Sequence, residues 1–126
     1  MSTNFVLPTG EGQVLQFSVP IKKNYEFRRV YNKGKSAATS RVVVYCRPCR
    51  TAEQNHLGIT VGTKIGKAVI RNKIRRRIKE IYRLNEEKLK SGYDIVIVAR
   101  VRSREAQYKE LEHDILKLCS KLGIVK

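Results

Sequence analysis

The chain has 126 residues, which suits one domain built around a single hydrophobic core. Its 27 lysines and arginines face 11 aspartates and glutamates, and the formal charge of +16 indicates a polyanionic partner: nucleic acid first, an anionic membrane surface second. A hydrophobic fraction of 41% argues against wholesale disorder, and with neither a signal peptide nor an apolar run of ~18 residues we expect a cytoplasmic protein.

The first part of the chain divides into an extension and a short helix. Residues 1–20 contain two prolines, two glycines and few charges, so we expect a loosely ordered extension in which Val14–Val19 is a candidate strand. Residues 21–126 should form a single domain. Asn24 is a suitable N-cap for a helix over Tyr25–Asn32, which Gly34 should end.

Two strands follow, separated by a polar loop over Pro48–Asn55. The first, Arg41–Arg47, alternates between two sets of side chains: Val42, Val44 and Cys46 on one face, and Arg41, Val43, Tyr45 and Arg47 on the other. The second strand directs Leu57, Ile59 and Val61 one way and Gly58, Thr60 and Gly62 the other.

The second half contains two amphipathic helices around one apolar strand. A helix is predicted over Ala68–Lys90, and Ser91-Gly92 should end it. One face of this helix carries a narrow isoleucine stripe: Ile70, Ile74, Ile78 and Ile81. Residues Asp94–Arg100 are apolar on both faces, which indicates a central strand. Ser103 should cap a last helix with a leucine-rich stripe: Leu111, Ile115, Leu118 and Leu122. The pattern predicts an α+β domain, a small sheet packed by two or three helices.

The segment from residue 64 to residue 83 is the main candidate for polyanion binding. It carries nine basic residues against the single acid Glu80: Lys64, Lys67, Arg71, Lys73, Arg75, Arg76, Arg77, Lys79 and Arg83. Like charges four residues apart destabilise a free helix by ~0.2–0.5 kcal/mol per pair. A helix that keeps such basic pairs on one face is therefore expected to bind an anion outside the protein. Arginine predominates, and its planar guanidinium binds phosphate oxygens in a bidentate manner.

A second candidate surface combines aromatic and small residues. Phe27 and Tyr31 share one helical face, and Tyr45 shares a strand face with Arg41 and Arg47. Gly58, Thr60 and Gly62 would leave room for a ligand. Aromatic rings beside cations stack unpaired bases, although ordinary core packing of Phe27 and Tyr31 remains the alternative.

The cysteines and acids indicate no catalytic or metal site. Cys46-Arg-Pro-Cys49 has the spacing of half a zinc site, but no second pair completes four ligands, and Cys119 makes the count odd. We expect structural thiols, with metal or redox use as the alternative. A protein nuclease needs convergent carboxylates or an acid and a base; Asp94, Asp114, His56 and His113 show no such pattern.

The basic segment resembles a known family. Residues 68–80, Ala-Val-Ile-Arg-Asn-Lys-Ile-Arg-Arg-Arg-Ile-Lys-Glu, are similar to the basic helix of the ribonuclease P protein subunit, whose core is Arg-Asn-Arg. Lys73 stands at the third core position, which keeps the charge and loses the bidentate geometry. Residues 22–34, 57–69 and 94–100 are similar to the family's first helix and two strands in the same order, so the resemblance covers about residues 20–122.

The resemblance implies a fold and a function. The fold is a mostly antiparallel sheet packed by helices, like the second domain of ribosomal protein S5, with a left-handed strand–helix–strand crossover against the usual hand. The implied role is to help a catalytic RNA, in a 1:1 complex, remove the 5′ leader of precursor transfer RNA; magnesium would be held mainly by the RNA, and no membrane is involved. A plain structural RNA binder such as a ribosomal protein is the competing interpretation.

The resemblance also assigns residues to two RNA contacts. The catalytic RNA would meet the basic helix and the residues before it: Lys64, Lys67, Arg71, Asn72, Lys73, Arg75, Arg76 and Lys79. The single-stranded leader would lie in a cleft beside the first helix, against five side chains: Phe27, Tyr31, Arg41, Tyr45 and Thr60.

Overall fold

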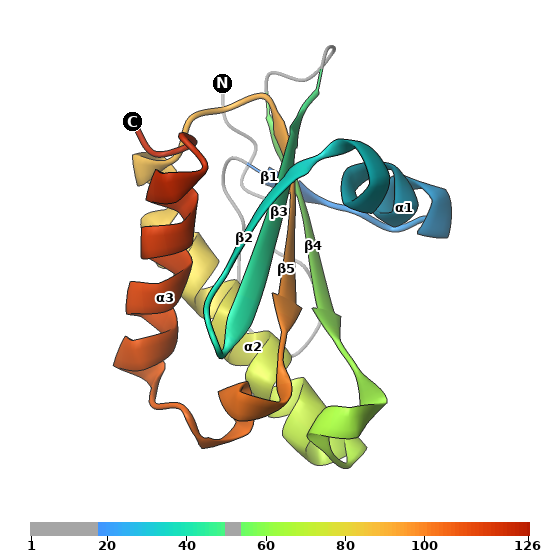
Figure 1. The fold of residues 1–126 in the computed structure, drawn as a ribbon, viewed down its shortest axis with the longest axis vertical. Helices are drawn as coiled ribbons and strands as arrows, with labels where there is room; N and C mark the ends of the chain where they lie inside the picture. The colour runs from blue at the N-terminus through green and yellow to red at the C-terminus, as the bar shows by residue number, and fades with distance from the viewer. Residues whose placement is uncertain (1–17, 50–53) are drawn as a thin grey trace.

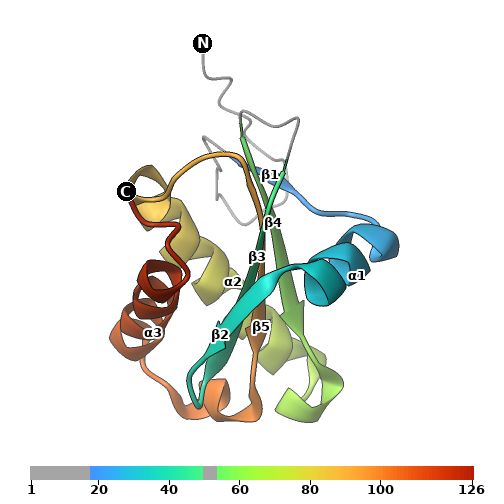
Figure 2. The ribbon, with the colours of Figure 1, turned by 45° about the horizontal axis from the view of Figure 1, so that its top comes forward.

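The computed structural model describes residues 18–49 and 54–126, which form a five-stranded sheet with helices on both faces (Figure 1). The strands are β1 (Ser18–Pro20), β2 (Lys35–Ala38), β3 (Val42–Pro48), β4 (Asn55–Val61) and β5 (Tyr93–Ala99). The helices are α1 (Asn24–Lys33), α2 (Ala68–Asn85) and α3 (Tyr108–Lys121), and three short 3₁₀ turns are η1 (Thr63–Ile65), η2 (Glu86–Lys88) and η3 (Val101–Glu105). Helix α1 lies on one side of the sheet, and α2 and α3 lie on the other (Figure 2).

The sheet is mixed, with the strand order β1-β4-β5-β3-β2. Pairs β1–β4 and β4–β5 are parallel, whereas β3–β5 and β2–β3 are antiparallel, so the expectation of a mostly antiparallel sheet was too strong. The expected extension is partly structured, because its last three residues form β1 on the edge of the sheet. The rest of the candidate strand Val14–Val19 lies outside the described residues.

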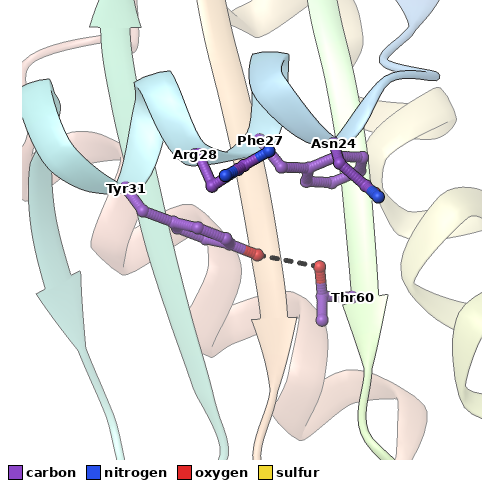
Figure 3. A pocket seen from close by; sticks show the side chains of 5 residues that line it. All are labelled: Asn24, Phe27, Arg28, Tyr31 and Thr60. Carbon is purple, nitrogen blue, oxygen red and sulfur yellow. Dashed lines mark hydrogen bonds between the residues drawn. The ribbon is translucent and has the colours of Figure 1, made fainter.

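Strands β4 and β5 with the intervening helix α2 form a left-handed crossover. The two strands are parallel neighbours, and α2 packs on the face away from α1. Seen from the α1 side in Figure 3, both strands point downward and β5 (orange) lies to the left of β4 (green). A right-handed crossover would place β5 to the right in this view, so the hand implied by the family resemblance is confirmed.

The main core lies between the sheet and the pair α2–α3. The isoleucine stripe supplies three buried side chains of α2, Ile74, Ile78 and Ile81, and α3 supplies the buried Leu111, Ile115 and Leu118. They meet the inward residues of the strands: Val42, Val44, Cys46, Leu57, Val61, Ile95 and Ile97. Burial of each large aliphatic side chain contributes ~1.5–3 kcal/mol, so these stripes hold α2 and α3 on the sheet.

The helix ends differ from the predictions in three places. Helix α1 is capped at Lys23, not Asn24: the Lys23 amide, in extended backbone, donates to Glu26 Oε1 at 3.2 Å. Helix α2 stops at Asn85, short of Lys90, because η2 follows and Leu89 then bridges to Val125.

Ser103 does not cap the last helix. Its hydroxyl donates to the Arg100 carbonyl at 2.6 Å within η3. Helix α3 begins after Gln107, whose amide donates to Glu110 Oε1 at 2.9 Å. The expected start at Ser103 thus lies in a short 3₁₀ turn, and the helix begins after Gln107, four residues later.

Gly34 ends α1 because the backbone passes very close to other carbonyls there. A Cβ atom at this position would lie 2.5 Å from the Val30 carbonyl oxygen and 2.7 Å from the Cys46 carbonyl oxygen. The glycine backbone is extended (φ −86°, ψ 167°), so close approach rather than a left-handed conformation requires it. The turn leads directly into β2.

Candidate nucleic-acid interface

Aromatic side chains of α1 and β3 meet on the outer face of the sheet. Tyr31 shares a hydrogen bond of 2.9 Å between its hydroxyl and that of Thr60 on β4 (Figure 3). Its ring centroid lies 6.4 Å from that of Phe27 and 4.9 Å from that of Tyr45, which it meets edge to face at 73°. The structure thus brings together four of the five predicted leader-contact residues, namely Phe27, Tyr31, Tyr45 and Thr60.

A surface pocket of about 500 Å³ opens beside α1, and we call it the α1 cleft. Within the described part of the chain its lining residues are Asn24, Phe27, Arg28, Tyr31 and Thr60. The sequence reasoning missed Asn24 and Arg28, although a helical wheel places both on the flank of the Phe27–Tyr31 face. Arg28 is exposed and supplies a cation at the cleft, the role expected of Arg41. Tyr45 supports Tyr31 from β3 without lining the pocket.

The small residues of β4 act differently from each other. A Cβ atom at Gly58 would lie 2.5 Å from Phe27 Cε1, so the space above Gly58 is filled by the Phe27 ring and not left for a ligand. At Gly62 no heavy atom of the described residues, its own chain neighbours aside, lies within 4 Å of the corresponding point. Gly58 therefore seats Phe27, Thr60 lines the cleft, and Gly62 lies outside the lining residues.

The aromatic residues belong partly to a small core. Val30, Val96 and Ile21 are buried beneath α1, and Phe27, Tyr31 and Tyr45 pack against them while remaining half-buried. One side of each ring is thus held by apolar contacts. Packing and ligand contact, which the sequence presented as alternatives, are compatible in this geometry.

Arg41 does not lie in the cleft, and its predicted position beside Tyr45 was wrong. Its guanidinium bridges to α3, with Nη2 2.9 Å from Glu110 Oε2 and Nη1 3.0 Å from Asp114 Oδ2. The hydrogen bond to Asp114 raises the pKa of Arg41. Arg41 precedes the first residue of β3, so the strand alternation that grouped it with Tyr45 does not apply. Its role is to join the start of β3 to α3.

The basic helix α2 begins beyond the ends of β4 and β5, as Figure 1 shows. Its isoleucine stripe is buried against the sheet, which leaves the predicted basic residues on the outer surface. Five of the eight predicted contact residues are exposed, namely Lys64, Lys67, Asn72, Lys73 and Arg76; Arg71, Arg75 and Lys79 are half-buried.

Several basic side chains are held by contacts within the protein. Arg71 Nε donates to the Gly66 carbonyl at 3.2 Å, and Arg75 Nη1 donates to Asn72 Oδ1 at 3.1 Å. Arg77 Nη1 reaches the Ala106 carbonyl at 3.4 Å, and Arg83 pairs with Glu80. The helix thus presents partly ordered cations, and Arg77 and Arg83 serve the fold.

The thiols of Cys46 and Cys49 do not form a pair. Cys46 is buried in the main core, where burial raises the pKa of its thiol, and all three cysteines are free. Burial likewise raises the pKa of Cys119 to about 12. Cys49 is only half-buried and lies past the end of β3. Cys46 is therefore a core thiol, whereas Cys49 lies nearer the surface, past the end of the strand.

Comparison with known proteins gives a consistent result. The chain matches the family model described as Ribonuclease P over residues 15–123. It is 40% identical over 111 residues to the ribonuclease P protein component of Alkaliphilus metalliredigens, covering 88% of this chain and 99% of that protein. For the Clostridium botulinum (strain Langeland) counterpart the identity is 47% over 105 residues, covering 82% and 94%. The solved RNase P protein of Staphylococcus aureus superposes with a TM-score of 0.79 at 31% identity, covering 85% of this chain and 97% of that one.

Proposed function

Because the chain belongs to the ribonuclease P protein family, we propose that it binds the catalytic RNA through α2 and the 5′ leader of precursor transfer RNA through the α1 cleft. Family membership makes the chain a component of an endoribonuclease of transfer RNA 5′ processing, with the ribonuclease P RNA as its partner. The binding surfaces, the precursor contact and a 1:1 ratio of protein to RNA are the proposed parts.

The observation that carries the proposal is the α1 cleft. Phe27 and Tyr31 are anchored on one side by the small core beneath α1 and half-exposed on the other, beside the exposed guanidinium of Arg28. Such a rigid platform loses little conformational entropy when unpaired bases stack on it, and each stacked base contributes ~1–3 kcal/mol. The Thr60 and Tyr31 hydroxyls add polar partners for a base edge or a sugar.

The catalytic RNA suits the surface of α2. This surface lies on the other side of the sheet from α1, so the chain can contact two RNA segments at once. The exposed lysines and arginines of α2 would replace counterions along the phosphate backbone, which makes assembly depend strongly on salt.

Hydrolysis is assigned to the RNA and its magnesium ions. Among the described residues, Asp114 is engaged by Arg41, and Glu80 by Arg83. These carboxylates serve ion pairs of the fold and do not converge on the α1 cleft. The proposed contribution of the protein is to hold the leader and to lower the counterion requirement of the RNA.

The experiment that tests the cleft compares precursor with mature transfer RNA. Tyr31→Ala should weaken precursor binding to the reconstituted holoenzyme by roughly 5- to 150-fold, the loss of one stacked base at ~1–3 kcal/mol. Mature transfer RNA lacks the leader, so its affinity should change little. Tyr25→Ala is the matched control, because Tyr25 is a half-exposed aromatic of the same helix that meets Lys23 and Arg29 outside the cleft.

Two outcomes would contradict the proposal. If Tyr31→Ala weakened the binding of precursor and mature transfer RNA equally, the leader would not bind in the α1 cleft. Retention of full precursor affinity by a folded Tyr31→Ala protein, checked by circular dichroism, would assign the ring to packing alone. A ribosomal role would instead appear as copurification with ribosomal RNA and no effect on precursor cleavage.

A further inference from the structure

Three potential metal ligands that are distant in the sequence meet at one end of the sheet. Cys49 follows β3, His56 is the second residue of β4 and Asp94 is the second residue of β5. One ligand atom of each side chain lies within 4.8 Å of the other two. The group is separate from the α2 surface and from the residues that line the α1 cleft.

Strand register brings the three residues together. His56 pairs with Asp94 across the parallel β4–β5 ladder, and their neighbours Leu57 and Ile95 point into the main core, so both side chains lie on the α1 face. The Cys49 amide donates to the Gly92 carbonyl at 2.7 Å, which holds the chain beyond β3 against the start of β5. Each ligand is therefore fixed by backbone hydrogen bonding.

We propose that Cys49, His56 and Asp94 form a binding site for a zinc ion. A thiolate, an imidazole and a carboxylate are the three side-chain donors that zinc uses, and sites with three protein ligands leave the fourth position to water. Bonds of about 2.0–2.3 Å on a tetrahedral ion place neighbouring ligand atoms about 3.3–3.6 Å apart. The observed separations, 3.0 Å between His56 Nδ1 and Asp94 Oδ1 and at most 4.8 Å overall, bracket that spacing.

The state of His56 supports a missing ligand. Its Nδ1 is shielded from solvent and has no hydrogen-bond partner among residues 18–49 and 54–126, although Asp94 Oδ1 lies at ion-pair distance. The close oxygen is thus not aligned for a hydrogen bond with the ring nitrogen. Burying a polar nitrogen without a partner is unfavourable, and a metal ion shared by the two groups would remove that penalty. A simple His–Asp ion pair would also leave the adjacent thiol of Cys49 unexplained.

The thiolate, imidazole and carboxylate donors of this site distinguish its ion from the magnesium expected on the RNA. Magnesium prefers six oxygen ligands, whereas thiolate and imidazole select zinc and similar transition ions. The site would join the end of β3 to the starts of β4 and β5, and β4 also lines the α1 cleft through Thr60. His56 lies two residues, about 6.6 Å along the strand, before Gly58, which seats Phe27. The ion would therefore brace the sheet beneath the aromatic platform.

Cobalt titration of the full RNA-free chain tests the site directly. After chelator treatment, Co²⁺ should produce the visible bands of tetrahedral cobalt and a near-ultraviolet thiolate-to-cobalt band, saturating at one equivalent and displaced by Zn²⁺. Cys49→Ser should abolish the thiolate band. His56→Gln should weaken cobalt affinity by at least about tenfold, the effect that loss of even an outer-shell partner produces.

Matched controls distinguish the site from other thiols and histidines. His113→Gln alters the exposed histidine of α3, and Cys46→Ala removes the buried cysteine of the same C-x-x-C; both should keep the cobalt spectrum. Zinc should raise the Tm of the parent chain and not that of Cys49→Ser, because an ion bound only to the folded state stabilises it. Absence of the thiolate band in the parent chain, or its persistence in folded Cys49→Ser, would overturn the proposal.

Discussion

Gly58 shows how a single residue controls the α1 cleft. Its missing side chain leaves the space that the Phe27 ring occupies, and Phe27 in turn forms a wall of the pocket. A glycine that seemed to make room for a ligand therefore makes room for the side chain expected to contact the ligand.

We predict that Gly58→Ala displaces Phe27. The new methyl group would lie within 2.8 Å of two ring atoms, so the ring must shift, at a cost of ~1–3 kcal/mol in stability. Selective binding of precursor over mature transfer RNA should fall with it. Gly62→Ala is the control, because its methyl group enters open space at φ −74°. Unfolding by urea and holoenzyme binding measure the two effects; equal behaviour of both variants would contradict this role of Gly58.

A second residue, Tyr82, makes stability sensitive to alkaline pH. Its hydroxyl lies 2.7 Å from Ser18 Oγ, and burial raises its pKa from 10.0 to about 12. Between these values the unfolded chain loses the phenol proton while the folded chain keeps it, so the free energy of unfolding falls as the pH rises.

We predict that Tyr82→Phe reduces this alkaline loss. Its free energy of unfolding should be lower by ~1 kcal/mol at neutral pH, where the hydrogen bond to Ser18 is missing. It should then decline less steeply than that of the parent chain between pH 10 and pH 12. Urea unfolding at several pH values measures both slopes. The raised pKa of Cys119 lowers the free energy of unfolding in the same way from about pH 9 upward. This decrease should persist in Tyr82→Phe. Parallel slopes would show that Tyr82 ionises equally in both states.

At the scale of elements, α2 separates its two tasks by face. The isoleucine stripe attaches the helix to the sheet, and the basic side chains remain on the outside. Substitutions on the outer face should therefore affect RNA binding more than folding.

We predict that the triple variant Arg71→Ala, Arg75→Ala, Arg76→Ala assembles more weakly with the RNA. Each lost phosphate contact should reduce the slope of log K against log salt by ~0.7–0.9, so the triple variant should lose about two to three units of slope. A control variant replaces three exposed lysines of α3, Lys109, Lys117 and Lys121. Circular dichroism verifies the fold. If the salt slope of the arginine variant were unchanged, the basic face of α2 would be in contact with solvent and not with the RNA.

At the scale of the whole molecule, the two proposed RNA surfaces lie on opposite faces of one thin sheet. Helix α1 and its cleft occupy one face, and α2 and α3 cover the other. A chain of this shape can lie between the catalytic RNA and the leader of the substrate. No helix within residues 18–49 and 54–126 is long and apolar enough to cross a membrane.

We predict that the protein without RNA does not cleave precursor transfer RNA. Added to a ribonuclease P RNA, it should lower the magnesium concentration needed for cleavage, because its positive charge replaces counterions near phosphates. Cleavage rates over a magnesium series, with and without the protein, measure the effect. Sustained cleavage by RNA-free protein would place the chemistry in this chain.

The sequence by itself determined what depends on local periodicity. The isoleucine and leucine stripes located α2 and α3 because helical spacing places i, i+3 and i+4 side chains on one face. The alternation in β3 and β4 separated Val42, Val44 and Leu57 from Tyr45 and Thr60, and the structure shows that the first set faces the main core. The grouping of Phe27 and Tyr31 followed from the same rule, and the left-handed crossover came from the family resemblance alone.

Only the tertiary structure decided the contacts between segments. Strand β2 is short and mostly exposed, so its sequence shows no alternation, and it forms only because β3 offers an edge. Arg41 turns to α3 because Glu110 and Asp114, about seventy residues later, come within ion-pair distance. Cys49, His56 and Asp94 meet because the register of β3, β4 and β5 aligns residues that no local pattern connects. Side-chain period is a property of one element, whereas register and charge pairing are properties of elements brought together.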